Sequence, residues 1–389
     1  MIGSGRRRTG PLILAVTIFL VEVGFTIWGL GAIHIVEIPQ TFRGSEKPSH
    51  LPCWNLAGAN DTLVVLRTGA TELLDKLPAH LDTSARCFPN YVVYSDYEEY
   101  YHGQLIVDTL DSISQNIREE HPDFELYRRL KSDGRSALRD GAFRGGNAAV
   151  NGMGKPSGNS ENPGWKLDKW KFLPMVNRTL YDFPDMKWYI FTEVDAYVSW
   201  STMLQYLSTL DATQLVYAGQ SMSVGADYFI YGGAGIIMSR SALQAVVAHY
   251  SSHKKDLEDV TDRHWAGDAV LGKAFKDAGV SLTNIWPMMQ SDYPGWLTYL
   301  PLNGGSMEDG IAEAWCNPVA TFHHVSPKAV RDLWYAEQEW TMIQTNASHL
   351  LVPSERLIAN ALVSIERRPY STATGCVRSL YPTTDGTIT

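Results

Sequence analysis

Cysteine and positive charge are both scarce in this sequence, and each scarcity narrows the class of protein. Only 4 of the 389 residues are cysteine, and no two are spaced Cys-x-x-Cys. This excludes a small disulfide scaffold and argues against a zinc site. Lysine and arginine number 33 against 42 aspartates and glutamates, a formal net charge of −9. No stretch of the body is strongly basic, so we expect no nucleic-acid partner.

The remaining composition is that of a folded protein. Hydrophobic residues make up 44% and aromatic residues 11%, which excludes an intrinsically disordered chain, and 32 glycines are too few for a collagen. A chain of this length can hold two average domains, or one large α/β domain with appendages.

One apolar run near the amino terminus is long enough to cross a membrane. It extends from Pro11 to about Ile33 and follows three arginines at positions 6–8, which place the amino terminus in the cytoplasm. The run exceeds the usual hydrophobic region of a cleaved signal peptide. Glu22 opposes insertion by about 2.5–3.5 kcal/mol, which the apolar residues around it offset. We predict a cytoplasmic tail at residues 1–10 and a type II signal anchor, a transmembrane helix, at residues 11–33. A cleaved signal peptide or a buried soluble helix is the alternative.

Two features of the body agree with a secretory lumen. Three N-glycosylation sequons begin at Asn60, Asn177 and Asn346. The cysteines form an even set, and disulfides persist in oxidising compartments. We expect the pairs Cys53–Cys87, flanking the first strand, and Cys316–Cys376, pinning the carboxyl-terminal tail. Four free buried thiols are the alternative.

Apolar runs and helical patterns alternate along the body. We expect strands at residues 62–69, 91–96, 187–193 and 216–219, and one after the glycines at 232–235. We expect helices at residues 72–81, 106–117, 166–180, 201–210, 241–250 and 268–278. The alternation predicts a mostly parallel sheet with helices on both faces. We expect a polar stem at residues 34–60 and a mobile loop at residues 141–164, which are rich in Gly, Asn, Ser and Pro.

The strongest chemical motif is Glu193-Val194-Asp195 at the end of an apolar strand. Ligands of open α/β sheets bind at the carboxyl ends of strands, and carboxylates there can hold a hard divalent cation against a diphosphate. The alternative is that the acids cap the next helix.

Three further motifs lie downstream. Gly232-Gly233-Ala234-Gly235 permits close backbone approach to a ligand, or forms a turn. Asp268 at a helix start is a candidate general base, or a helix cap. His323-His324 after an apolar segment could ligate a metal, or be structural.

In this order and spacing the four motifs resemble those of the Fringe-like family 31 glycosyltransferases. These include the Fringe N-acetylglucosaminyltransferases and the core 1 β1,3-galactosyltransferase, and the uncharacterised fungal members are the most similar. The resemblance runs from about residue 61 to residue 330. It matches residues 193–195 to the family's acidic D-D-D, residues 232–235 with Ser239-Arg240 to G-G-A-G…S-R, Asp268 and Gly272 to D-D-x-x-x-G, and Phe322-His323 to F-H.

The resemblance implies a GT-A fold at residues 61–345, a Rossmann-like nucleotide half joined to an acceptor half, followed by an extension at residues 346–389. It implies that Asp195 and His323 bind Mn²⁺ and that Asp268 is the catalytic base. The nucleotide-binding residues implied are Thr68, Asp96, Lys171, Glu193, Gly233 and Gly235. The sequence departs from the family at Glu193 and Gly267, where the family has aspartates, and at Ala196, where it has Thr or Asn.

The implied activity is an inverting, metal-dependent transfer of a hexose or N-acetylhexosamine from a UDP-sugar to a hydroxyl group of a glycan or glycoprotein, with a β1,3 linkage expected. The implied location is the Golgi membrane, with the catalytic domain luminal. One alternative is a non-catalytic Golgi protein that binds UDP or sugar. Another is a luminal phosphate-ester hydrolase, which would need a second cluster of metal ligands. The donor sugar, the acceptor, the choice between His323 and His324 and the oligomeric state stay open.

Overall fold

The computed structural model describes residues 51, 53–139, 149–150, 156–157, 162–225, 227–294 and 318–346. The predicted anchor at 11–33, most of the stem, most of the 141–164 loop, and Cys316 and Cys376 lie outside these ranges. Within them, no helix combines the length and apolar character that crossing a membrane requires.

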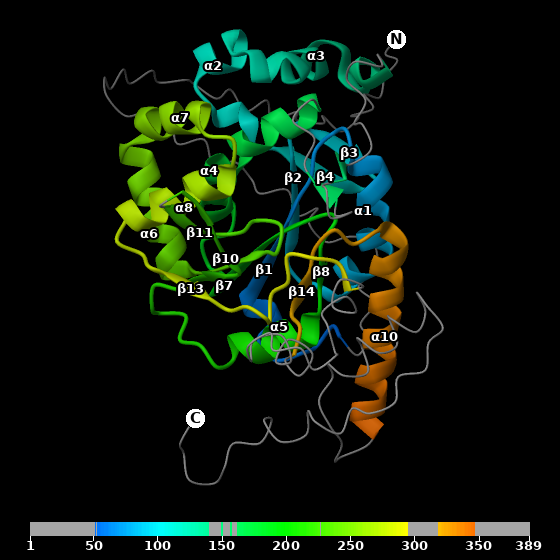
Figure 1. Ribbon diagram of the computed structural model, residues 1–389. Helices are drawn as coiled ribbons and strands as arrows, with labels where there is room; N and C mark the ends of the chain where they lie inside the picture. Colours follow the sequence, from blue (N-terminus) through cyan, green and yellow to red (C-terminus); the bar gives the residue numbers. More distant parts are fainter. Residues whose placement is uncertain are drawn as a thin grey trace, which may run out of the picture. The chain divides into compact units, whose positions relative to one another are not determined.

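The described chain is built around an eight-stranded sheet with the order β13-β9-β12-β7-β1-β2-β4-β3 (Figure 1). Its strands are β1 (Thr62–Arg67), β2 (Tyr91–Ser95), β3 (Glu99–Tyr101), β4 (Gln104–Asp108), β7 (Trp188–Glu193), β9 (Tyr217–Gly219), β12 (Ile236–Ser239) and β13 (Leu282–Asn284). β1 is parallel to both β2 and β7, β2 to β4, and β9 to β13, while β3 and β12 are antiparallel to their neighbours. The prediction of a mostly parallel α/β sheet is confirmed.

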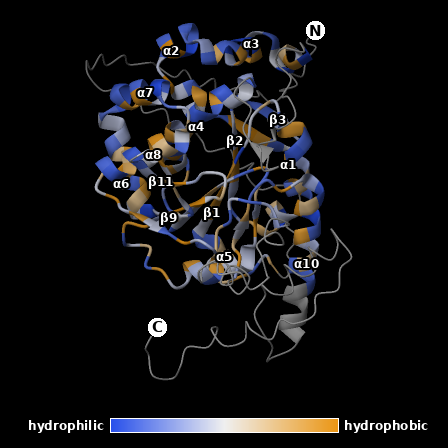
Figure 2. Ribbon diagram, viewed as in Figure 1, coloured by the Kyte–Doolittle hydropathy of each residue, from blue (hydrophilic) through white to orange (hydrophobic). Residues whose placement is uncertain are grey.

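Helices cover both faces of this sheet because its central strands are apolar on both sides. Val64 and Leu66 of β1 pack in a cluster with α1 (Leu73–Asp82), α5 (Trp200–Leu207) and α10 (Pro327–Asn346). Leu63 and Val65 pack in a second cluster with α4 (Pro163–Asp182), α6 (Arg240–Ser252), α7 (Lys254–Arg263) and α8 (Gly267–Asp277). Figure 2 shows the matching pattern, with hydrophobic and hydrophilic residues on different sides of these helices.

Smaller elements complete the described chain. The remaining α-helices are α2 (Gln115–Glu120) and α3 (Glu125–Asp133). Short 3₁₀ helices are η2 (Ala59–Asp61), η3 (Ser84–Cys87), η4 (Leu110–Ser112), η5 (Pro122–Phe124) and η6 (Gly134–Arg139). Three two-stranded antiparallel sheets pair β5 (Ala149–Val150) with β6 (Pro156–Ser157), β8 (Tyr197–Val198) with β14 (Thr321–Phe322), and β10 (Ser221–Val224) with β11 (Asp227–Ile230).

The helix expected from residue 106 to residue 117 is wrong over its first part. Residues 104–108 form β4, which pairs with β3 across a two-residue turn of His102 and Gly103. Both turn residues have positive φ, 49° and 80°, as tight hairpin turns require. The aliphatic residues at 105–107 therefore belong to a strand, and the α-helix begins only at Gln115.

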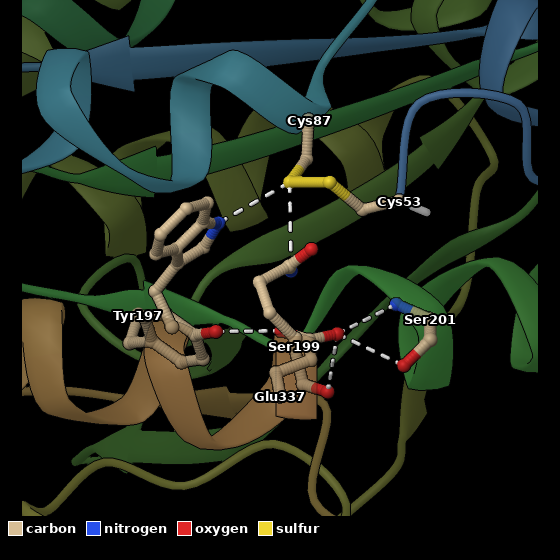
Figure 3. Close-up of a disulfide and its surroundings, with 8 residues drawn as sticks. Cys53, Cys87, Tyr197, Ser199, Ser201 and Glu337 are labelled. Carbon is tan, nitrogen blue, oxygen red and sulfur yellow. Dashed lines mark hydrogen bonds between the residues drawn. A yellow bond between two sulfur atoms is a disulfide. The ribbon is translucent and has the colours of Figure 1, made fainter. Parts of the chain in front are cut away.

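The predicted disulfide between Cys53 and Cys87 is confirmed (Figure 3). Cys87 is the last residue of η3, and the indole Nε1 of Trp334 on α10 donates a hydrogen bond of 3.2 Å to its sulfur. The disulfide therefore connects the segment before β1 to a region that packs against α10.

Replacing Cys53 and Cys87 with serine should lower the free energy of unfolding by about 3–4 kcal/mol. The disulfide closes a loop with a sequence separation of 34 residues and so restricts the unfolded chain. Urea denaturation of the full-length chain, with and without reductant, measures the loss. Reductant added to the double variant controls for the other two cysteines. Equal unfolding free energies for the variant and the wild type would contradict the prediction.

Candidate functional site

The acidic motif lies where two central parallel strands end. Arg67 and Glu193 are register partners at the ends of β1 and β7. The chain then turns through Val194 and Asp195 before β8, which pairs with β14. This pairing brings His323, the residue after β14, back to the turn. We refer to residues 193–195 as the acidic turn.

The acidic turn faces two histidines. Ligand atoms of Asp195, His323 and His324 all lie within 4.8 Å of one another. Asp195 Oδ1 and His323 Nε2 are 3.3 Å apart, and both are buried atoms without a hydrogen-bond partner. Buried polar atoms are rarely left unsatisfied, and a divalent cation would satisfy both. The side chains present therefore fit a metal, and binding of that metal by Asp195 and His323 stays a prediction. His324 is a third candidate ligand.

The backbone at His324 explains why two adjacent histidines share this space. Its φ is 54°, in the left-handed region that residues other than glycine adopt only occasionally. The two imidazole centroids lie 3.8 Å apart. Burial, followed by the neighbouring His323, lowers the pKa of His324 to about 4. His324 is therefore neutral near pH 7, the form that can bind a metal.

The electrostatics of the acidic turn favour a positive charge beside it. Burial alone would lower the pKa of His323, but the carboxylates of Asp195 and Glu193 outweigh it and raise the pKa to about 10. Burial would likewise raise the pKa of Asp195, but His323 and Lys76 hold it well below its usual range. Asp195 is thus an ionised carboxylate near neutral pH.

Glu193 has a different environment from Asp195. Arg67 bonds both Glu193 and Asp168 and lies over the ring of Phe172, with its guanidinium carbon 4.1 Å from the ring centroid. Burial raises the pKa of Glu193, but Arg67 and then His323 lower it to a net value of about 2. The structure therefore places this predicted nucleotide-binding residue in an ion pair with Arg67, 3.6 Å from His323.

Two residues of α1 that sequence reasoning missed contact the acidic turn. The ammonium of Lys76 is 2.9 Å from Asp195 Oδ2 and 2.6 Å from Glu72 Oε2. His80 Nε2 donates a hydrogen bond of 2.9 Å to the carbonyl of Val194. The spacing of Glu72 and Lys76 in the sequence indicates only a helical ion pair, and nothing local marks His80.

His80 is a buried positioning residue for the turn. Because the Val194 carbonyl can only accept, Nε2 carries the proton, and Nδ1 accepts from the hydroxyl of Ser84 at 2.9 Å. Burial lowers the pKa of His80 to about 4, so the ring stays neutral. Ser84 belongs to η3, which ends at the disulfide. The fold thus supports the acidic turn from α1 and η3.

The chain after the turn is held by Glu337 of α10. This buried carboxylate accepts hydrogen bonds from the hydroxyl of Tyr197 at 2.5 Å and from the hydroxyl and amide of Ser201 at 2.9 and 3.0 Å (Figure 3). Burial raises the pKa of Glu337. α10 therefore fixes the exit from the acidic turn in the same region where it contacts the disulfide.

The predicted nucleotide residues Thr68, Asp96 and Lys171 lie together at the ends of β1 and β2. Lys171 Nζ is 3.0 Å from Asp96 Oδ2 and donates to the Thr68 carbonyl at 2.8 Å. Asp96 Oδ1 accepts from the amide of Ala70 at 2.8 Å. All three predicted residues are nearly fully buried, and in this structure they bond one another and the main chain that follows β1. A contact with nucleotide remains a prediction.

Asp268 lies in the first turn of α8, as the sequence predicted, but it does not act as the N-cap. Its Oδ2 accepts from the amide of Gly232 and its Oδ1 from the amide of Ala269, both at 2.9 Å, while the N-cap position belongs to Ala266. The side chain is buried, which raises its pKa to about 6. Asp268 therefore links the helix to residues 232–235, which we refer to as the glycine segment.

The glycine segment is shaped by its neighbours. A Cβ at Gly233 would lie 2.4 Å from Cε1 of His323, so only glycine lets the imidazole lie there. The hydroxyl of Tyr231 lies 3.3 Å from Nδ1, the other ring nitrogen of His323. Gly235 has a φ of +96°. Gly233 therefore approaches His323 closely, whereas the predicted approach of this backbone to a bound ligand stays a prediction.

Packing also explains one departure from the family. A Cβ at Gly267, where the family has an acid, would lie 2.5 Å from the carbonyl oxygen of Lys169 on α4. α4 and α8 are in contact, so a side chain at this position would force them apart. Glycine here is a requirement of close helix packing.

Comparison with known families supports the resemblance in the middle of the chain. Residues 168–292 match the family model described as Fringe-like, a glycosyltransferase-type family. The match includes the acidic turn, the glycine segment and Asp268, and it ends before His323. A search of curated proteins found no match.

Substituting Gly233 with alanine should weaken manganese binding by about 10- to 100-fold, the usual scale when a ligand's support is lost, because the new methyl group displaces His323. Calorimetric titration of the full-length chain with Mn²⁺ measures the effect. Gly232→Ala is the matched control, since its Cβ would meet Phe172 and leave His323 in place. Unchanged manganese affinity in Gly233→Ala would show that His323 is not a ligand.

Proposed function

We propose that this protein is an inverting glycosyltransferase that moves a hexose or N-acetylhexosamine from a UDP-sugar to a hydroxyl group of a glycan or glycoprotein, forming a β1,3 linkage. The observation that carries the proposal is the contrast between two buried carboxylates. Asp195 lies among cationic groups and is held ionised, whereas burial raises the pKa of Asp268 to about 6. Carboxylates whose environments separate their pKa values commonly have separate catalytic roles.

The first role is metal binding. Asp195 with His323 or His324 would hold a divalent cation, for which Mn²⁺ is the proposed ion. When bound, this ion would neutralise the diphosphate that leaves with the nucleotide. Glu193 would add little free charge, because Arg67 already neutralises it.

The second role is proton transfer. In an inverting reaction the acceptor hydroxyl attacks the anomeric carbon from the face opposite the leaving group, so its base must be separate from the metal ligands. Each oxygen of Asp268 accepts one amide hydrogen bond and keeps a second acceptor position. These bonds fix the carboxylate, and burial raises its basicity above that of an exposed aspartate. Asp268 would accept the proton of the acceptor hydroxyl.

The sequence also supports a cellular location for this reaction. We propose that residues 11–33 anchor the protein in the Golgi membrane with residues 61–345 as the luminal catalytic domain. The Cys53–Cys87 disulfide agrees with an oxidising compartment. Against a phosphate-ester hydrolase, the described residues contain one group of potential metal ligands rather than two.

A screen of UDP-sugars with the full-length chain and Mn²⁺ tests the proposal. Release of UDP should require the metal and rise when an acceptor glycan is added. Asp268→Asn should slow transfer by about 100-fold or more while UDP and manganese binding persist. The variant loses one acceptor for a buried amide, so its unfolding free energy is measured alongside. Normal transfer by Asp268→Asn would exclude it as the base. UDP binding that needs no metal, without turnover of any donor, would indicate the non-catalytic alternative.

The pH profile gives an independent test. A base must be ionised, and burial raises the pKa of Asp268 to about 6, so kcat/KM should fall as the pH drops below 6, approaching about tenfold per pH unit. Manganese affinity measured at each pH separates this effect from loss of the metal. A profile that stays flat down to pH 5 with the metal still bound would contradict the assignment.

A further inference from the structure

Lys76 binds the same carboxylate that we assign to the metal. Its ammonium lies 2.9 Å from Asp195 Oδ2, while Asp195 Oδ1 faces His323 Nε2 at 3.3 Å. The side chain is 29% exposed, so Lys76 lies at the edge of the site rather than within the core. Leu73 and Leu77 of α1 are fully buried and fix the helix, which limits the positions the ammonium can reach.

A metal ion at Asp195 would repel this ammonium. The repulsion between two like charges is several times stronger near a protein surface than in water, and a divalent ion doubles it. Glu193 does not relieve the repulsion, because its charge is committed to Arg67. Glu72 offers Lys76 one negative charge at 2.6 Å. With both cations present, the site lacks negative charge.

A nucleoside diphosphate would supply that charge. Each of its two phosphoryl groups carries at least one negative charge, and lysine is a flexible point charge with three donors that suit phosphate oxygens. A diphosphate bound to the metal would therefore lie within reach of a lysine that already contacts the metal's ligand.

We propose that Lys76 is a diphosphate-binding residue that makes donor and metal binding interdependent. Without nucleotide, its ammonium pairs with Asp195 and weakens metal binding. With nucleotide, it turns to a phosphate oxygen and frees the carboxylate. This inference rests on the proposed function, since it assumes a nucleotide donor and a metal at Asp195.

The competing explanation is an ordinary ion pair that holds α1 to the acidic turn. The two explanations predict opposite changes in manganese affinity when Lys76 is removed. If Lys76 only supports Asp195, its removal should weaken manganese binding with and without nucleotide. If it competes with the metal, its removal should strengthen manganese binding in the absence of nucleotide.

Calorimetric titration of full-length Lys76→Met with Mn²⁺ and UDP separates them. We expect manganese affinity without UDP to rise about 5- to 10-fold, and UDP affinity at saturating Mn²⁺ to fall about 10-fold or more, the scale for loss of a charged hydrogen bond. Lys76→Arg keeps the charge and should restore most of the UDP affinity. Lys273→Met is the matched control, because it removes another helical ion pair, with Asp277 on α8.

These titrations distinguish failure of the inference from failure of the proposed function. The inference would be overturned if Lys76→Met bound manganese more weakly than the wild type without UDP, or if its UDP affinity were unchanged. The proposed function would still stand in that case, provided that the wild type binds Mn²⁺ and UDP. A wild-type protein that binds neither Mn²⁺ nor UDP would instead overturn the proposed function itself.

Discussion

Three hydrogen bonds with neighbouring elements hold the main chain of Val194 and Asp195, and the geometry of the site depends on them. The amide of Val194 donates to the carbonyl of Arg67 at 3.1 Å, and the carbonyl of Val194 accepts from His80 at 2.9 Å. The carbonyl of Asp195 accepts from the amide of Val325 at 2.7 Å. The backbone of the turn is fixed from β1, α1 and the segment after β14. It directs the Asp195 carboxylate toward His323, whose Nε2 lies 3.3 Å from Oδ1. A carboxylate held in this way is prepared for a cation.

The same fold separates the charges of the site. Arg67 at the end of β1 neutralises Glu193 and leaves Asp195 as the acid that faces the histidines. Asp268 reaches its position from another helix, and burial there raises its pKa although the two amides that it bonds lower it. Two buried carboxylates with opposite pKa shifts can therefore coexist in one site because different secondary-structure elements supply their neighbours.

The sequence predicted the central strands well because buried parallel strands are continuous apolar runs, as at β1 and β7. It failed at β3 and β4, where a two-residue turn at His102 and Gly103 was the only local signal of a hairpin. The acidic turn, the glycine segment and Asp268 could be found as motifs. Lys76 and His80 could not, because their partners lie 119 and 114 residues away and only the packing of α1 brings them together.

The central claim is that the acidic turn and the two histidines form a divalent metal site for a nucleotide diphosphate. Pulsed electron paramagnetic resonance of Mn²⁺ bound to the full-length chain with UDP tests it most directly. The account predicts a nitrogen coupling from a directly bound imidazole together with phosphorus couplings from the diphosphate. The nitrogen coupling should disappear when His323 and His324 are both replaced by alanine. Bound Mn²⁺ with phosphorus couplings but no nitrogen coupling in the wild type would contradict the account.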